Sequence, residues 1–210
     1  MKQLAKCAAI LLCLSLIGIQ GHAQGEKKQS KTYPLVISLL NTSTLLPGAG
    51  KLGIWGTPVH PGFSLGTEFH KNDPKRNDWF QTVKFAYSYH QYVQHNVLLF
   101  SELGYRHHFS KAFDVEARLG IGYLHSFPDT KIYALGFDGV YRRVHNLGRS
   151  QGMGSFSLGL GYTFNHGSGS RVFIAEQFYV QGPFVNQYVT FLPSSVIHLG
   201  VAFPFFHSSK

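Results

Sequence analysis

Cysteine is nearly absent from this sequence. The 210 residues contain two cysteines, Cys7 and Cys13, and both lie within the first 23 residues. The rest of the chain therefore carries no disulfide bond, no thiolate metal site and no cysteine nucleophile. We expect neither a metal ion nor a cofactor.

Long apolar runs are also missing beyond residue 23, where no stretch reaches the roughly eighteen consecutive apolar residues of a membrane-spanning helix. Before that point, Lys2 and Lys6 form a short basic region ahead of the apolar run 8–19. Residues 21–23 (Gly-His-Ala) then place small residues at the −3 and −1 positions of a cleavage site. These features predict a cleavable secretory signal peptide over residues 1–23.

Acidic residues are few: 10 Asp and Glu stand against 19 Lys and Arg, for a net charge of +9. Removal of the signal leaves 17 basic residues and a net charge of +7. In an exported protein this balance argues against nucleic acid and favours contact with an anionic lipid A surface. The polar residues 24–32 are expected to form a flexible N-terminal lead, and residues 33–210 a single domain.

Glycine and aromatic residues are abundant, with 23 Gly and 15% aromatics, which favours strands over helices. Segments 79–93, 97–109 and 113–125 each alternate large apolar residues with polar, charged or glycine residues. A period of two predicts β-strands. These runs are longer than the five or six residues usual in soluble domains, and they match the roughly nine to eleven residues that cross a bilayer.

Four more segments show the same alternation: 63–70, 156–164, 171–181 and 197–205. In one of them, 171–181, the alternation is interrupted, because Glu176 falls in phase with apolar residues of the same strand. Single-chain bacterial barrels have even strand numbers, and we take residues 34–42 as the missing strand, with 131–141 as the alternative. The sequence thus predicts an all-β fold, an antiparallel transmembrane β-barrel of eight strands.

The connections between these strands differ in length. With a periplasmic N-terminus, the outside connections are 43–59, 93–96, 127–152 and 182–194, and the inside ones are 71–78, 110–112 and 166–170. Long outside loops and short inside turns are typical of such barrels. This orientation places an aromatic girdle at the periplasmic rim, formed by Tyr105, Phe109, Phe113, Tyr162, Phe164, Phe203 and Phe205.

One face of the alternating strands carries charges of both signs together with glycines, which suits a narrow lumen. The candidates for a lumen charge network are Glu68, Lys84, Glu102, Arg106, Asp114, Glu116 and Arg118. Buried charges must be paired. The main interpretation is a structural plug of salt bridges, and the alternative is a path for protons or ions.

The signal, the alternating strands and a last strand ending in residues 201–206 (Val-Ala-Phe-Pro-Phe-Phe) carry a resemblance. Together they resemble the small outer-membrane β-barrel superfamily of OmpA-like and OmpX-like proteins of Gram-negative bacteria. The resemblance implies a cell outer-membrane location, contact with outer-membrane lipids and lipopolysaccharide, and a terminal aromatic residue read by the barrel-insertion machinery. It also implies a monomer with a structural or surface-interaction role and no catalysis.

A second resemblance concerns His166, Ser168 and Glu176. Outer-membrane lipid A deacylases, which are similar in size and architecture, use a His/Ser/Glu set in which an imidazole activates the serine. A lipid A-modifying hydrolase is therefore the alternative function. The same residues 166–170 (His-Gly-Ser-Gly-Ser) also fit an ordinary tight turn on the periplasmic side.

The alternating strands leave two further alternatives for the whole protein, a narrow channel or transporter for small solutes and a soluble periplasmic lipid-binding barrel. Separately, the outer loop 127–152 is a candidate for contact with lipopolysaccharide or a protein. That loop carries basic and aromatic residues, namely Tyr133, Phe137, Tyr141, Arg142, Arg143, His145 and Arg149. Among the histidines, His70 and His198 are in lumen phase and within possible reach of each other, whereas His107 and His108 point to opposite faces.

Overall fold

The computed structural model describes residues 32–44, 59–71, 76–90, 94–129, 132–135, 137–144, 147–164, 170–184 and 190–207. The predicted signal peptide, the lead up to residue 31, and the pair His166 and Ser168 lie outside these ranges. Among the residues described, no helix has the length and apolar character needed to cross a membrane.

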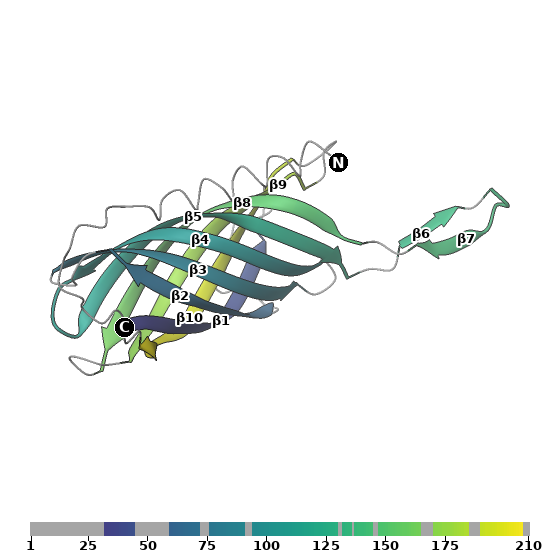
Figure 1. The fold of residues 1–210 in the computed structure, drawn as a ribbon. Coiled ribbons are helices and arrows are strands. Elements are labelled where there is room, and N and C mark those ends of the chain that lie inside the picture. Colours follow the sequence, from purple (N-terminus) through teal and green to yellow (C-terminus); the bar gives the residue numbers. More distant parts are fainter. Residues whose placement is uncertain are drawn as a thin grey trace. The chain divides into compact units, whose positions relative to one another are not determined.

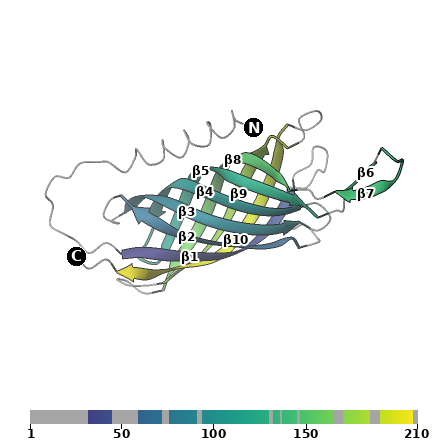
Figure 2. The same ribbon diagram turned by 45° about the vertical axis from the view of Figure 1, so that its right-hand side comes forward.

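Ten strands make up the described fold (Figure 1). They are β1 (Thr32–Thr44), β2 (Pro61–His70), β3 (Asn77–His90), β4 (Gln94–His108), β5 (Phe113–Pro128), β6 (Ile132–Leu135), β7 (Tyr141–Val144), β8 (Arg149–Thr163), β9 (Arg171–Gly182) and β10 (Leu192–His207). Eight of them form a closed barrel in the order β1-β10-β9-β8-β5-β4-β3-β2, and every neighbouring pair is antiparallel (Figure 2). The predicted fold class is confirmed.

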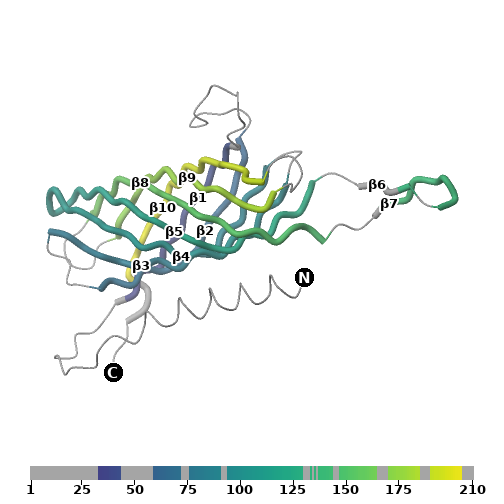
Figure 3. Tube along the Cα trace, turned by 90° about the horizontal axis from the view of Figure 1, so that it is seen from above, coloured from purple at the N-terminus to yellow at the C-terminus, as the bar shows by residue number. Residues whose placement is uncertain are grey.

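The barrel closes between its first and last strands, which run side by side in the tube view (Figure 3). Their pairing extends from Thr32 opposite His207 to Thr44 opposite Ser194. The choice of 34–42 as the first barrel strand is therefore confirmed. The alternative segment, 131–141, is wrong as a barrel strand, because its residues contribute to β6 and β7, which pair only with each other in a separate two-stranded sheet.

The two ends of the barrel differ in the connections that they carry. Three connections, around 71–76, 109–112 and 164–170, lie at the end where β1 begins, and we call this the short-turn end. The opposite end, where β1 stops, is called the loop end. There the predicted loop 127–152 is too long, because β5 continues to Pro128 and β8 already begins at Arg149. Glycines at outward positions 152 and 154 interrupt the alternation and conceal the start of β8 from sequence analysis.

The wall has two chemically opposite faces. From Gln151 to Tyr162 of β8, for example, buried and exposed residues alternate: Ser157 is fully buried, and its neighbour Leu158 is 50% exposed. The outward face is apolar around the barrel, as shown by the exposed side chains Ile37, Leu39, Phe63, Leu65, Val83, Phe85, Leu99, Leu103, Leu119, Ile121, Phe156, Leu158, Leu160, Ile174 and Leu199. An apolar surface on this scale far exceeds the patches that soluble monomers expose.

Aromatic rings gather on the outward face at the short-turn end. Phe113 and Tyr162 pack edge to face at 4.9 Å, and Tyr162 contacts Phe164 at 5.0 Å. Trp79 and Tyr105 form a tilted pair with ring centres 5.0 Å apart. This arrangement has the form of an interfacial aromatic girdle, in which amphipathic rings lie at the boundary between lipid and water.

The outward wall gives a first prediction. Leu119 and Val59 are both 65% exposed, but Leu119 lies mid-strand on the wall, whereas Val59 precedes β2 at the loop end. We expect Leu119→Arg to lower the free energy of unfolding from lipid vesicles by about 2–4 kcal/mol, and Val59→Arg by about 0–1 kcal/mol. Denaturant titration measures both values. Equally small losses would show that the mid-wall faces water.

Candidate functional site

The lumen is the candidate site, because it gathers the charged side chains of the barrel. Every second residue of each strand points inward, so the strand register decides which side chains meet. Three levels follow one another from the short-turn end toward the loop end. We call them the Arg106 network, the Glu102 network and the apolar layer, and each is defined below.

The Arg106 network comprises Glu68, Asp78, Arg106, Asp114, Glu116 and Arg171. Its centre is Arg106 on β4, which stands opposite Glu116 of β5. The Arg106 Nη2 donates to Glu68 Oε2 and to Glu116 Oε2, both at 2.9 Å. The guanidinium carbon lies 4.3 Å from the centre of the Phe80 ring. Charge-assisted hydrogen bonds and a ring contact thus hold this cation in one geometry.

A second arginine completes the network from β9. The Arg171 Nη2 lies 2.5 Å from Asp114 Oδ1 and 3.0 Å from Glu116 Oε2. Its guanidinium group occupies space that a side chain at position 161 would fill, since a Cβ on Gly161 would collide with it. The glycine at position 161 thus leaves the space through which Arg171 approaches the two carboxylates.

The Glu102 network comprises Lys84, Glu102, Arg118, Ser157, Gln177 and His198. Glu102 Oε2 lies 2.7 Å from Lys84 Nζ and 3.5 Å from an Arg118 nitrogen. Its other oxygen accepts hydrogen bonds from Ser157 at 3.0 Å and from Gln177 at 3.2 Å. Both carboxylate oxygens of Glu102 are therefore satisfied inside the barrel.

His198 extends this network to β1. Gln177 donates its amide to Glu102, so its oxygen accepts from His198 Nε2 at 3.0 Å. His198 Nδ1 then accepts from Ser38 at 3.3 Å, which assigns the tautomer with the proton on Nε2. The structure does not bring His198 to His70, which instead lies 2.5 Å from Asp78.

The buried charges nearly balance. Among the described residues, five acids (Glu68, Asp78, Glu102, Asp114 and Glu116) are buried with four bases (Lys84, Arg106, Arg118 and Arg171). Each of these nine side chains lies within ion-pair distance of an opposite charge. Burial on this scale is tolerable only with such pairing, because an uncompensated buried charge costs several kcal/mol.

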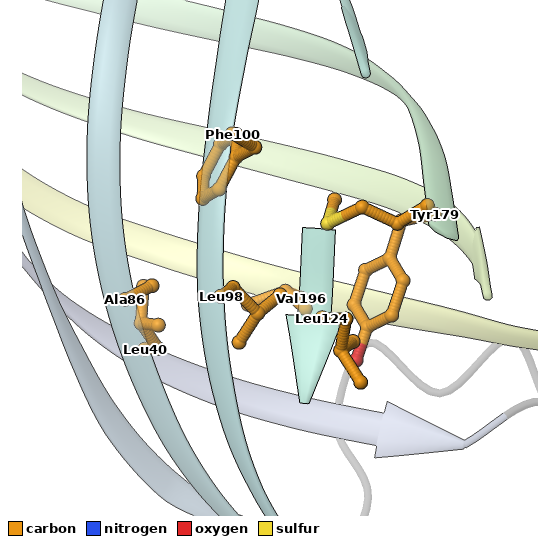
Figure 4. Close-up of a cluster of buried hydrophobic side chains, with 8 residues drawn as sticks. Leu40, Ala86, Leu98, Phe100, Leu124, Tyr179 and Val196 are labelled. Carbon is orange, nitrogen blue, oxygen red and sulfur yellow. The ribbon is translucent and has the colours of Figure 1, made fainter. Parts of the chain in front are cut away.

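The apolar layer lies beyond the Glu102 network, on the loop-end side. It consists of Leu40, Ala86, Leu98, Phe100, Leu124, Met153, Tyr179 and Val196, and all but Met153 are labelled in Figure 4. A cavity of about 10 Å³ remains against this layer and reaches down to Gln177 and His198. That volume is about what one water molecule requires. Side chains therefore fill this part of the lumen.

The structure places all seven lumen residues predicted from sequence on the inner face, each at most 4% exposed and each within the two networks. The sequence analysis did not predict two members of the networks. Asp78 was assigned to a turn, and Arg171 at the start of a predicted strand was not considered as a lumen residue. Both residues alternate in phase with inward-pointing residues of the same strand, and this phase was the sequence signal that could have identified them. The roles of Ser157, Gln177 and His198 depend on strand register, which the alternation alone does not provide.

Of the three hydrolase candidates, Glu176 lies within the described residues. Glu176 lies in the middle of β9 on the outward face and accepts a hydrogen bond from Ser195 at 3.1 Å. His166 and Ser168 lie outside the described ranges. Within those ranges, no group of three or more His, Cys, Asp and Glu residues has an arrangement that holds a metal ion.

Comparison with solved structures identifies the fold. The crystal structure of Neisserial surface protein A matches with a TM-score of 0.57, covering 85% of this chain and 100% of that one at 10% identity. The chain has the fold of a small outer-membrane β-barrel. At this identity the similarity concerns the fold alone. Neither a protein-family model nor a curated protein sequence matches the chain.

Two other small outer-membrane barrels superpose less closely. The attachment invasion locus protein Ail of Yersinia pestis matches at 12% identity and a TM-score of 0.46, over 84% of this chain and 100% of Ail. The outer membrane enzyme PagL matches at 13% identity and a TM-score of 0.48, over 81% of this chain and 99% of PagL.

The Arg106 network gives a second prediction. Arg106→Ala leaves Glu68 and Glu116 without their shared cation, and we expect the free energy of unfolding to fall by about 3–5 kcal/mol. The matched control is Arg142→Ala in the exposed Arg142–Asp138 pair, where the loss should be about 0–1 kcal/mol. Denaturant titration in vesicles measures both. A loss below 1 kcal/mol for Arg106→Ala would contradict the structural importance of the network.

Proposed function

We propose that this chain is a resident of the cell outer membrane, a plugged barrel with a structural or surface-interaction role and no catalysis. One observation carries the proposal: the wall is apolar outside and ion-paired inside. This inverted arrangement stabilises only a barrel that is surrounded by lipid, because there the apolar outer surface contacts hydrocarbon in place of water.

The inverted arrangement argues against a soluble lipid-binding barrel. Such a barrel would keep apolar side chains inside and charges outside. Here nine charged side chains are buried, while residues such as Leu39, Leu119 and Leu160 are between 59% and 67% exposed. In water this surface would drive aggregation.

The filled lumen argues against a channel. A solute entering from the short-turn end meets the Arg106 and Glu102 networks, and beyond them the apolar layer leaves a cavity of only about 10 Å³. Widening this path would separate buried ion pairs and leave charges uncompensated. The structural interpretation of the charge network is therefore favoured over an ion path.

The loop end supports a role in surface interaction. Strands β6 and β7 pair only with each other, and their hairpin exposes Tyr133, Leu135, Tyr141 and Arg143, with Phe137 at the turn. An isolated two-stranded hairpin is marginally stable in water. Basic and aromatic side chains on such an element suit contact with anionic lipopolysaccharide or with a protein outside the cell. Lipid contact along the wall and delivery by the barrel-insertion machinery complete the proposal.

The proposal is tested by membrane extraction and by conductance. The chain should stay in the membrane pellet after alkaline carbonate washing, because its apolar wall is embedded in lipid. In planar bilayers the purified barrel should give no steady conductance, with a porin reconstituted in the same bilayers as the positive control. Release by carbonate would contradict the membrane location, and a steady conductance would contradict the plug.

A further inference from the structure

The exposed charges at the short-turn end have one sign. Among the described residues at this end, the Lys, Arg, Asp and Glu side chains that are exposed are Lys71, Arg76 and Lys111, and we call them the basic rim. They follow one side of the barrel, where β2, β3, β4 and β5 are neighbours. In the sequence, the three connections at this end contain four basic residues (Lys71, Lys75, Arg76 and Lys111) and one acidic residue (Asp73).

The acids of the Arg106 network do not neutralise the basic rim. Asp78 and Asp114 lie at this end of the barrel, but they are 0% and 2% exposed. Each is paired inside the lumen, Asp78 with His70 and Asp114 with Arg171. The basic rim therefore has no ion-pair partner among the described residues, and its charge acts on the surroundings of the barrel.

Backbone hydrogen bonds hold the first two cations of the basic rim in place. The Lys71 N–H donates to Trp79 O at 2.9 Å, which continues the β2–β3 ladder by one pair and places Lys71 beside an outward aromatic ring. The Arg76 carbonyl accepts from the His108 N–H at 2.9 Å. Both ends of the turn between β2 and β3 are thus fixed, so an anion that binds there orders side chains rather than backbone.

The turn that carries Lys111 is also well defined. Ser110 Oγ accepts hydrogen bonds from the backbone N–H groups of Ala112 at 3.2 Å and of Phe113 at 3.0 Å. The Ala112 carbonyl accepts from the Thr163 N–H at 2.8 Å, which ties the turn to β8. Lys111 is therefore presented to the outside from a turn that is fixed by its own strands and by the next one.

The basic rim lies at the level of lipid headgroups. The aromatic girdle marks the boundary of the hydrocarbon at this end, and Lys71 is paired with Trp79 of that girdle. Lys111 is two residues from Phe113, which is at most about 5 Å along the axis of a barrel with strands tilted by about 40°. The headgroup layer is about 5–8 Å thick on each side of the hydrocarbon. The side chains of the basic rim thus reach headgroups.

We propose that the basic rim binds the anionic headgroups of phospholipids such as phosphatidylglycerol, and so selects the lipids around the short-turn end. Lys and Arg near a membrane surface attract anionic lipid, and their attractions add when no acid offsets them. Ammonium and guanidinium groups also donate charge-assisted hydrogen bonds to phosphate oxygens. The expected orientation places this end in the periplasmic leaflet, which holds phospholipids. The inference rests on the proposed membrane location and names the lipid class at one end of the wall.

Quenching of Trp79 fluorescence measures which lipid lies at the basic rim. Trp79 is 49% exposed beside Lys71, and the one other tryptophan in the sequence is removed by Trp55→Phe. The Trp55→Phe protein is reconstituted in mixed vesicles of phosphatidylcholine and phosphatidylglycerol, with brominated chains on one lipid or the other. The two quenching curves give the binding constant of phosphatidylglycerol relative to phosphatidylcholine. It should be at least about three at low salt and fall toward one in about 0.5 M NaCl.

Charge variants in the Trp55→Phe protein test which residues select the lipid. Lys71→Gln with Lys111→Gln should lower the relative constant to about one, and Lys71→Glu with Lys111→Glu should lower it below one, because the headgroup is then repelled. The matched control is Arg142→Gln with Arg143→Gln, which removes the same charge from the loop-end hairpin. It should leave the constant within about 1.5-fold, since the hairpin is more than a screening length from Trp79. Equal thermal midpoints in pure phosphatidylcholine verify that the variants fold.

The outcomes separate this proposal from the proposed function. A relative constant of about one in the Trp55→Phe protein, or a constant that the Lys71 and Lys111 variants leave unchanged, overturns the basic rim as a lipid site. An equal loss in the Arg142 and Arg143 control also overturns it, because selection would then follow net charge. In these cases Trp79 is still quenched and the membrane location stands. Absence of quenching by either brominated lipid is the distinct result that overturns the proposed function.

Discussion

The hydrogen-bonded closure of β1 on β10 is the constraint on which the rest of the structure depends. Hydrocarbon offers no partner to a backbone N–H or C=O, so a sheet can span a membrane only when it has no open edge. The pairing that runs from Thr32–His207 to Thr44–Ser194 removes the two edges that the chain would otherwise expose. Once the sheet is closed, every second residue must enter a lumen bounded by only eight strands.

The narrow lumen explains both the ion pairs and the glycines. The guanidinium group of Arg171, for example, occupies space that a Cβ at position 161 would need. The paired charges add little net stability over an apolar core of equal volume, but they make the register specific. A slip of β4 by one residue would turn Arg106 from the lumen to the outer wall, and a slip by two would move it away from Glu116. The charge network therefore selects one pairing of the strands.

Strand alternation allowed the fold class and the inward charges to be predicted from sequence, because an apolar outer wall and a polar lumen impose the same rule on every strand. The first strand was predicted from the even strand number and the lengths of the connections. The prediction of strand bounds failed where outward positions carry no apolar side chain. Gly152 and Gly154 carry no apolar side chain outward, so the beginning of β8 was assigned to a loop. Contacts between strands far apart in the chain, such as Gln177 with Glu102, depend on register and closure, which no local pattern contains.

Two polar contacts on the outward wall show why Glu176 requires an explanation that other residues do not. Gln81 donates to Ser101 at 3.1 Å, and both groups are neutral, so their cost against lipid is modest. Glu176 has a comparable serine contact, but its side chain is ionisable, and Ser195 is the one donor to its carboxyl group among the described residues. An apolar residue would fit the same position between Ile174 and Phe178 without that cost. The disturbed alternation in 171–181 is thus the sequence signal of one carboxyl group that is held on the outward wall by a serine of the neighbouring strand.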